Sequence, residues 1–488
     1  MGRRPYAAAL VAAAVALAGC AGGSATVHLR KEQTGAIAWT PCDRVECGSL
    51  SVPLDYRRPN GTHITLALAR LPATGKAIGT LFTNPGGPGG SGVDFLREAA
   101  NVFPAEIRAS FDLVSWDPRG VGASAPVRCI GDLDAFYAVD RDPTTVSGVA
   151  ANVAASHALV DACKANSATI LPYVSTAATV RDLDAIRAAI GLEQITYVGF
   201  SYGTLLGAEY ADAFPKRVRA MVLDGAIDPA RSSAESTREQ AESFDADLDA
   251  FFAHCRADTS CSFAHGTDPA AAFDDLARTI AEEPIPATVD GEHRTLGPGE
   301  LNIGVASALY AGAAGYDDLA AALAQAGSGK GDEMLALSDA YTGRTKGGKY
   351  SNETAALYAI GCIDAPSPAS VAAVEEQANQ AARVAPRFGA TSFWLGLPCT
   401  FWPVPVEGKV APIHAPKAPP IVVVGAVHDP ATPYPWAQSL ASEMTTARLL
   451  TSEGSSHTSY GRGNRCVDGD VDLYLLHLVP PAAGTRCT

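Results

Sequence analysis

The chain has 488 residues, of which 47% are hydrophobic and 18% charged, a composition typical of a well-buried globular protein. The length fits a catalytic domain of roughly 250 to 300 residues with a large insertion or a second domain. The net charge of −15 argues against nucleic acid as a partner, because phosphate binding needs basic patches. It is compatible with cationic ligands such as free amino termini.

The N-terminus is typical of a targeting segment. Arg3 and Arg4 precede an apolar run that is too short to span a bilayer, which predicts a signal peptide over residues 1–19. The sequence Leu-Ala-Gly-Cys, ending at Cys20, is similar to the bacterial lipobox; the resemblance implies cleavage before Cys20, a diacylglycerol on its sulfur and stable membrane anchoring. A plain secretory signal is the alternative. Residues 20–35, small and polar, are expected to form a tether.

The cysteine count indicates an oxidising, extracytoplasmic compartment. Removing Cys20 from the 11 cysteines leaves an even number, which suits five disulfides. Zinc is the competitor, but the sequence has no C-x-x-C pair, H-E-x-x-H motif or histidine cluster, so we expect no metal and no cofactor. Pairing neighbours along the chain gives the hypothesis Cys42–Cys47, Cys129–Cys163, Cys255–Cys261, Cys362–Cys399 and Cys466–Cys487.

The first strand-like runs predict the opening antiparallel strands of a mixed sheet. Residues 50–56, 63–71 and 78–83 carry alternating or continuous apolar residues. The glycine-rich stretch 84–92 follows the third run directly. It lacks the Gly-Lys-Ser/Thr ending of a phosphate-binding loop, and a purely structural turn is a further alternative. We favour a loop that supplies an oxyanion-hole amide, with Gly87 as the donor.

The segment 111–116 is expected to be another strand, and it ends at Asp117-Pro118-Arg119-Gly120. Asp117 and Arg119 are expected to form a structural ion pair. Residues 179–190 carry apolar side chains at spacings of three or four, which predicts an amphipathic helix ended by Gly191.

The next segment, 195–206, contains the motif G-x-S-x-G between a β-branched, aromatic strand and a helix. This strand–turn–helix context is that of a nucleophile elbow. Gly199 and Gly203 would admit close neighbouring backbone, and Ser201 would sit at the tip of the turn. The amide of Tyr202, at the start of the helix, is expected to be the second oxyanion donor. An ordinary glycine-rich turn is the alternative.

The pattern changes after the strand at 218–223. Residues 230–405 are mostly Ala-rich helical patterns with few strand signals, which predicts a helical cap inserted between late strands. Helices fit residues 232–252, 301–323 and 367–384. The sheet would resume at the apolar run 421–425, and a last helix fits residues 471–478.

A serine nucleophile needs a base, and the base works best when a carboxylate orients it. Ser201, Asp429 and His457 follow the order Ser, acid, His of the α/β-hydrolases. His457 would take the Ser201 proton and pass it to the leaving amine. Asp224 also ends a strand and is the rival acid, and we expect His428 to be only a wall residue.

Five motifs carry a resemblance to a known family: Asn-Pro-Gly-Gly-Pro-Gly-Gly-Ser-Gly at 84–92, Trp-Asp-Pro-Arg-Gly at 116–120, Gly-Phe-Ser-Tyr-Gly-Thr at 199–204, Val-Leu-Asp-Gly at 222–225 and Asp-Pro-Ala-Thr-Pro at 429–433. In this order they resemble the secreted tripeptidyl aminopeptidases of actinobacteria, over nearly the whole mature chain. The resemblance implies an α/β-hydrolase with core segments 36–229 and 406–488 around a cap at 230–405. It also implies release of tripeptides or other short units from peptides with a free N-terminus.

The resemblance further implies that acidic residues of the cap hold the substrate amine. Glu239 and Glu242 lie at helical spacing with Glu235 and Asp245, and Asp364 follows Cys362. A solvated acidic helix face is the simpler interpretation of each residue. A carboxylesterase with the same triad and a non-catalytic binding lipoprotein remain as alternatives, because specificity depends on the cap.

Overall fold

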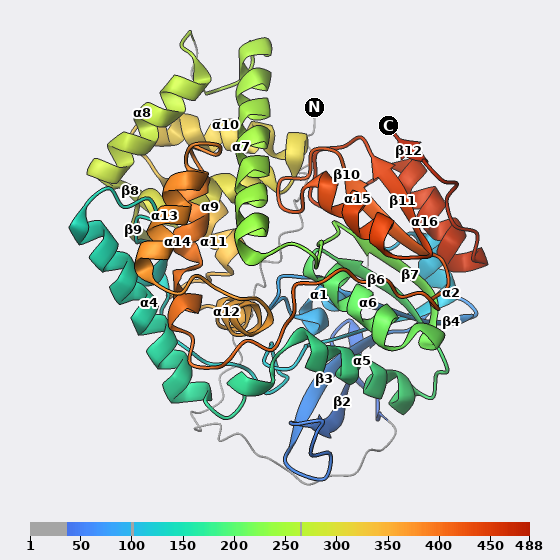
Figure 1. The fold of residues 1–488 in the computed structure, drawn as a ribbon. Coiled ribbons are helices and arrows are strands. Elements are labelled where there is room, and N and C mark those ends of the chain that lie inside the picture. Colours follow the sequence, from blue (N-terminus) through green and yellow to red (C-terminus); the bar gives the residue numbers. More distant parts are fainter. Residues whose placement is uncertain (1–36, 99–101, 264–265) are drawn as a thin grey trace.

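The computed structural model describes residues 37–98, 102–263 and 266–488. The expected signal peptide, the lipobox at Cys20 and the tether lie outside these residues. Within them, ten strands form one sheet in the order β1-β2-β3-β5-β4-β6-β7-β10-β11-β12 (Figure 1). Their bounds are β1 Thr40–Cys42, β2 Val45–Pro53, β3 His63–Leu71, β4 Gly79–Asn84, β5 Phe111–Trp116, β6 Ile195–Phe200, β7 Val218–Asp224, β10 Ile421–Ala426, β11 Ala447–Ser452 and β12 Arg486–Cys487.

The sheet is mixed and mostly parallel, as the sequence predicts. Strands β1, β2, β3 and β5 pair antiparallel, whereas every pairing from β5 through β4 to β12 is parallel. All residues of β6 and of β10 are buried. Their continuous apolar runs fit this position, because parallel strands are covered by helices on both faces.

Two groups of helices cover the sheet. One face packs against α5 (Thr176–Ile190), α6 (Tyr202–Ala213) and α15 (Tyr434–Glu443). The other face packs against α1 (Gly92–Glu98), α2 (Ala105–Ser110) and α16 (Arg465–His477). Helix α16 begins earlier than expected, because the Asn464 side chain caps it by accepting from the amides of Cys466 and Val467.

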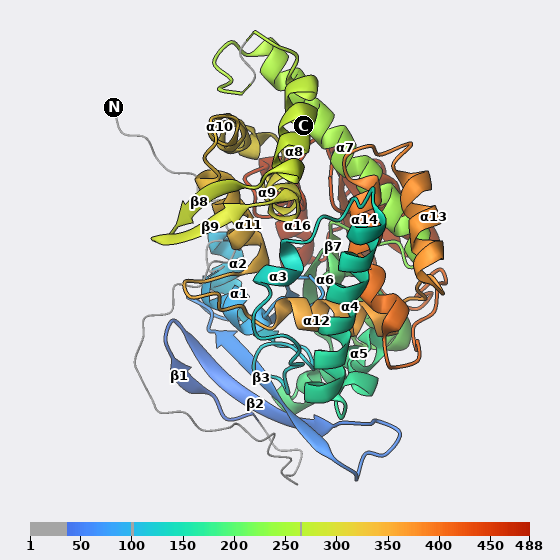
Figure 2. The same cartoon turned by 90° about the vertical axis from the view of Figure 1, so that its left-hand side faces the viewer.

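The chain between β7 and β10 forms a separate helical region beside the sheet (Figures 1 and 2). It has its own hydrophobic core, built around residues such as Phe251, Leu309 and Leu323. Its elements are α7 Ser233–Ala257, α8 Pro269–Glu282, β8 Ile285–Val289, β9 Glu292–Leu296, α9 Pro298–Leu309, α10 Tyr316–Gly327, α11 Asp332–Thr342, α12 Glu353–Asp364, α13 Val371–Ala381 and α14 Gly389–Leu395, with a 3₁₀ turn η5 at Leu397–Phe401.

Two features of this region differ from the sequence prediction. Strands β8 and β9 form a hairpin that the Ala-rich pattern did not indicate. The single helix expected over 301–323 is broken near Gly312, which has φ +59°. A Cβ at Gly312 would lie 2.5 Å from the backbone of Ser455, so the break lets the helical region approach the loop that precedes His457.

Helix α4 (Val146–Ser167) lies before β6 in the sequence and follows the short helix α3 (Asp134–Tyr137). It nevertheless contacts the helical region that follows β7, because its residues Val149 and Val153 pack against the hydrophobic cluster of α13 and α14. Figure 2 shows it alongside that region. Among the described helices, α4 alone is long and apolar enough to cross a membrane by length and composition. A single helix of this kind is weak evidence and does not establish a membrane span.

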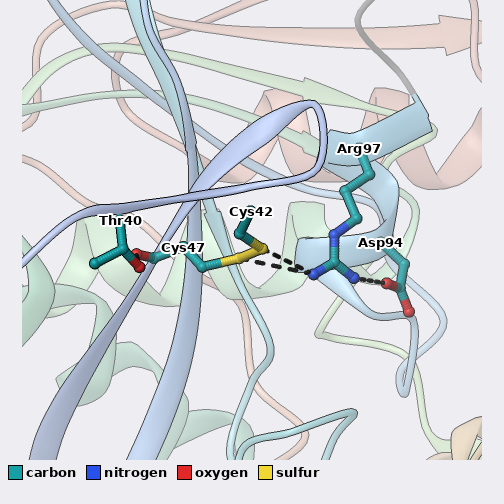
Figure 3. The surroundings of a disulfide bond; sticks show 5 residues. All are labelled: Thr40, Cys42, Cys47, Asp94 and Arg97. Carbon is teal, nitrogen blue, oxygen red and sulfur yellow. Dashed lines mark hydrogen bonds and ion pairs between the residues drawn. A yellow bond between two sulfur atoms is a disulfide. The ribbon is translucent and has the colours of Figure 1, made fainter. Parts of the chain in front are cut away.

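The structure contains five disulfides, and they join the same pairs as the hypothesis from the sequence: Cys42–Cys47, Cys129–Cys163, Cys255–Cys261, Cys362–Cys399 and Cys466–Cys487. Figure 3 shows the first of them, which closes the β1–β2 hairpin. The guanidinium of Arg97 contacts its sulfurs at 3.3 and 3.7 Å and donates to Asp94 at 2.8 Å. Arg97 thereby joins the hairpin to α1.

The expected ion pair between Asp117 and Arg119 is wrong. Arg119, fully buried, donates to both carboxylate oxygens of Asp182 on α5 at 2.7 Å. Asp117 instead accepts from the Ser91 hydroxyl at 2.6 Å and from the Val93 amide at the start of α1. The two side chains therefore stabilise different parts of the fold, and adjacency in the sequence did not reveal this.

Candidate active site

Ser201 occupies a strained turn between β6 and α6. Its backbone has φ 54° and ψ −123°, a conformation that non-glycine residues rarely adopt and that marks functional sites. The flanking glycines are required by space: a Cβ at Gly199 would lie 2.2 Å from the Gly203 carbonyl oxygen, and one at Gly203 would lie 2.7 Å from the Asn84 carbonyl oxygen. The turn has the geometry of a nucleophile elbow.

Backbone hydrogen bonds fix the Ser201 turn on both sides. The Ser201 amide donates to the Asp224 carbonyl at the end of β7 at 2.9 Å. The Ser201 carbonyl accepts from the Thr204 amide at 2.8 Å and from its hydroxyl at 2.6 Å. These bonds offset part of the strain, so the serine is held at the carboxyl end of the parallel strands.

The glycine-rich loop after β4 lies directly against the elbow. A Cβ at Gly86, whose φ is +100°, would lie 2.9 Å from the Ser201 Cβ and 3.2 Å from the Tyr202 nitrogen. Gly87, with φ +110°, is the next residue. The structure thus brings together the segments of both predicted oxyanion donors, Gly87 and Tyr202, next to Ser201. The donor roles themselves stay predictions.

His457 and Asp429 form a buried pair in the loops after β11 and β10. The His457 Nδ1 lies 2.9 Å from Oδ1 and 3.0 Å from Oδ2 of Asp429. Asp429 is 1% exposed and also accepts from the amides of Ala431 and Thr432 and from the Thr432 hydroxyl, each at 2.9 Å. A carboxylate held by this many donors keeps a fixed position and so fixes the imidazole orientation.

Asp224, the rival acid, has a different role in the structure. Its buried carboxylate accepts from the backbone amides of Ser459 and Tyr460 at 2.8 to 3.1 Å. Burial is the main cause that raises the pKa of Asp224 to about 6. Asp224 therefore fastens the loop that carries His457, while Asp429 contacts the imidazole. His428 is exposed, and its amide bonds to the Gly454 carbonyl at 3.2 Å.

The helical region reaches the imidazole through Tyr310, just after α9. The Tyr310 ring meets the His457 ring edge-on, with centroids 5.1 Å apart. The His457 amide donates to the Tyr310 carbonyl at 3.0 Å. His457 is 7% exposed, so this contact encloses the candidate base.

Glu239 and Glu242, two of the predicted amine-binding residues, already have cationic partners. Glu239 accepts from Arg231 at 3.0 Å and from the Trp436 indole at 2.6 Å. Glu242 accepts from Arg238 at 2.6 Å. An arginine partner satisfies the carboxylate, so an incoming ammonium would have to displace it.

The remaining acidic candidates are also engaged in local structure. Asp364, at the end of α12, accepts from the Thr176 amide at 2.9 Å and from its hydroxyl at 2.5 Å, and burial raises its pKa to about 6. Asp245 accepts from two backbone amides of the α13–α14 connection. Glu235 forms the capping box of α7 with Ser232. These contacts fit structural roles.

Glu353, the first residue of α12, lies with its backbone against the glycine-rich loop. A Cβ at Gly89 of the glycine-rich loop would lie 2.5 Å from the Glu353 carbonyl oxygen. An acid at the first turn of a helix is favoured in any helix by the dipole. The sequence therefore held no signal that separates Glu353 from an ordinary helix start.

One cluster within the described residues has metal-ligand character, formed by Cys466, Asp470 and Cys487. Its two sulfurs are joined in a disulfide. A disulfide has no thiolate to offer a metal, so this cluster does not fit a zinc site.

Comparison with known proteins agrees with this geometry. A family model described as alpha/beta hydrolase fold matches residues 79–266, and one described as TAP-like protein matches residues 385–487. The tripeptidyl aminopeptidase of Streptomyces lividans is 33% identical over 93% of the chain and 87% of its own length. The chain belongs to the tripeptidyl aminopeptidase family. It is a serine hydrolase with the α/β-hydrolase fold.

Other relatives in the family carry different names. The serine protease Hip1 of Mycobacterium tuberculosis is 36% identical over 98% of the chain and 96% of its own length. The carboxylesterase B of Mycobacterium tuberculosis is 36% identical over 90% of the chain and 86% of its own length. Membership of the family thus leaves the choice between peptide and ester substrates to the chemistry of the individual site.

Proposed function

We propose that the protein is a lipid-anchored, extracytoplasmic serine exopeptidase that releases tripeptides or other short units from the free N-terminus of peptides. The observation that supports the proposal is the buried His457–Asp429 pair in the loops after β11 and β10, in the same sheet whose β6 leads into the strained Ser201 turn. The relatives named serine protease and tripeptidyl aminopeptidase support peptide substrates.

In the proposed mechanism, the Ser201 hydroxyl attacks the scissile carbonyl while His457 Nε2 takes its proton. Asp429, bonded to Nδ1, stabilises the imidazolium. The amides of Gly87 and Tyr202 stabilise the oxyanion. His457 then gives the proton to the leaving amine, and the acyl-enzyme forms. A water molecule, deprotonated by His457, hydrolyses the ester and releases the short peptide acid.

Anchoring is proposed through a diacylglycerol on Cys20, with residues 20–35 as the tether. The expected result for Cys20→Ser in a bacterial host is loss of the protein from the membrane fraction. Membrane retention of that variant would refute the anchor without affecting the proposed catalysis.

A broad carboxylesterase is the second candidate, because one relative is named carboxylesterase B. The deciding experiment uses the protein lacking residues 1–20, with Ser201→Ala as control. It compares a free-amine tripeptidyl amide, the N-acetylated twin of that amide and a short-chain aryl ester. Ser201-dependent cleavage of the free-amine amide alone is the expected result. Turnover of the ester alone, or equal turnover of the acetylated amide, would favour the esterase, and absence of any activity would favour a binding lipoprotein.

A further inference from the structure

The loop that carries His457 contains a strained residue. Thr458, directly after the candidate base, is buried and has φ 68°. A β-branched residue in this left-handed region is an outlier, because its Cβ comes too close to the following carbonyl oxygen. Such a conformation persists only where the surrounding contacts impose it. The orientation of His457 therefore depends on the contacts that hold its loop.

The sheet domain holds the loop on the C-terminal side of Thr458. The amides of Ser459 and Tyr460 donate to the Asp224 carboxylate at the end of β7, at distances of 2.8 to 3.1 Å. Tyr460 is fully buried, and its ring meets the Phe103 ring edge-on with centroids 6.2 Å apart. This half of the loop is thus fixed without any contribution from the helical region.

The helical region holds the loop on the N-terminal side of the strained residue. The His457 amide donates to the Tyr310 carbonyl at 3.0 Å, and the Ala313 amide donates to the Ser455 hydroxyl at 2.9 Å. Gly312, between Tyr310 and Ala313, is buried, and a Cβ on it would lie 2.5 Å from the Ser455 backbone. The turn after α9 is therefore in direct contact with the start of the His457 loop.

The Tyr310 ring adds a side-chain contact to these backbone contacts. It meets the His457 ring with centroids 5.1 Å apart and planes at 88°. It also packs against Phe244 of α7 at 5.7 Å, and its hydroxyl lies 3.3 Å from the Tyr341 hydroxyl of α11. Two helices of the helical region thus fix the ring that contacts the imidazole. An aromatic pair of this kind contributes energy beyond the area that it buries.

We propose that Tyr310 is a positioning residue that holds His457 in the orientation needed to take the proton from Ser201. The inference rests on the proposed function and extends it, because it makes catalysis depend on the docking of the helical region. The physical reason is the strain at Thr458. Without the contacts from Tyr310, the loop would relax on its N-terminal side and turn the imidazole away. Amide and ester substrates would be affected alike, since both use the same base.

The test is Tyr310→Ala in the protein lacking residues 1–20, with a free-amine tripeptidyl amide and a short-chain aryl ester as substrates. We expect kcat to fall about tenfold for both substrates, the size of the loss of one aromatic pair. The rate of Ser201 labelling by a fluorophosphonate should fall by a similar factor. Tyr310→Phe keeps the ring and should retain kcat within about twofold of the parent. A loss for the amide alone would contradict the positioning role.

Thr458→Gly tests the role of strain, because glycine adopts φ 68° readily. In the Thr458→Gly background, Tyr310→Ala is expected to lower kcat only about twofold, since the two changes act on the same loop and do not add. An undiminished loss in that background would show the inference to be wrong. Ser455→Ala, which removes the acceptor of the Ala313 amide, is a milder second variant. It should lower kcat about fivefold, and Thr458→Gly should again reduce the loss.

Tyr316→Ala is the matched control. Tyr316 is also a tyrosine of the helical region, but it packs against Phe251 and donates to Asp247. It should lower the melting temperature and leave kcat unchanged. If Tyr310→Ala and Tyr316→Ala lower kcat equally, general loosening of the helical region explains the effect, and the inference is wrong while the proposed function stands. If the parent shows no Ser201-dependent turnover of either substrate, the proposed function itself fails.

Discussion

The hydroxyl of Ser243 on α7 donates to the backbone carbonyl of Asp429 at 2.7 Å. One turn earlier on the same helix face, the Gln240 amide donates to the Ala431 carbonyl at 2.5 Å. The first helix of the helical region thus clamps the loop that carries the candidate acid. This contact connects the helical region to the residue that bonds the His457 imidazole.

Ser243→Ala is expected to lower kcat about fivefold, because one hydrogen bond worth about 1 kcal/mol no longer holds the Asp429 loop. The loss should be equal for the amide and ester substrates, since the loop acts on His457 and not on the substrate. Ser236→Ala, on the same helix and without a side-chain contact to this loop, serves as the control. A change confined to KM would contradict a positioning role for Ser243.

Substituting Asp429 and Asp224 separately distinguishes the candidate catalytic acid from the aspartate that holds the backbone. Asp429→Asn is expected to lower kcat by about 10⁴, because the imidazole loses the carboxylate that fixes its tautomer. Asp224→Asn should mainly lower the melting temperature, since Asp224 holds the backbone of Ser459 and Tyr460. Calorimetry and steady-state kinetics on both variants separate the effects. The reverse pattern would make Asp224 the acid.

We expect that the nucleophile elbow leaves no room for a side chain at Gly86 in the glycine-rich loop. Gly86→Ala is expected to lower kcat at least tenfold, because the residue has φ +100° and the added carbon would lie 2.6 Å from the Phe200 carbonyl oxygen. Gly469→Ala is the contrasting change. Gly469 lies within α16 with open space around its Cα, so alanine should stabilise the protein by about 0.5–1 kcal/mol. Full activity of Gly86→Ala would place the catalytic serine elsewhere.

Because Asp247 on α7 is buried, we expect the free energy of unfolding to depend on pH. It is 4% exposed, its Oδ2 has no partner, and burial raises its pKa to about 7. The folded protein keeps this proton up to about pH 7, whereas an unfolded aspartate releases it near pH 4. The unfolded state therefore binds fewer protons between these values, and stability falls as pH rises through the window.

Asp247→Asn removes that titration. From pH 4 to pH 8, its stability relative to the parent should rise by about 2 to 4 kcal/mol, since each unit of pKa shift corresponds to about 1.4 kcal/mol. Melting temperatures of both proteins at the two pH values measure the difference. Asp249→Asn, at an exposed position on the same helix, should show no such trend. A constant difference across pH would refute the role given to Asp247.

Local patterns determined much of the fold. The sequence predicts the apolar runs of β6 and β10, which are fully buried in the sheet. Both faces of such a strand are covered by helices, so nearly every residue in it is apolar. The break near Gly312 could not be predicted, because it depends on contact with Ser455, and such a contact leaves no local pattern in the sequence. The β8–β9 hairpin does have a local signal, the Asp290-Gly291 turn with φ 52° and 78°, which the Ala-rich helical pattern around it obscured.

In the candidate site, too, some features follow from the local sequence and others depend on tertiary contacts. The sequence by itself determined Ser201 in its elbow, because its glycines are imposed by the turn, and it proposed Asp429 and His457 by their order after late strands. Only the tertiary structure decided that His457 lies on Asp429 while Asp224 serves the backbone. It also showed that Glu239 and Glu242 are paired with arginines. Whether a carboxylate has a partner depends on residues distant in the chain, and this is why the sequence could name acidic candidates but could not rank them.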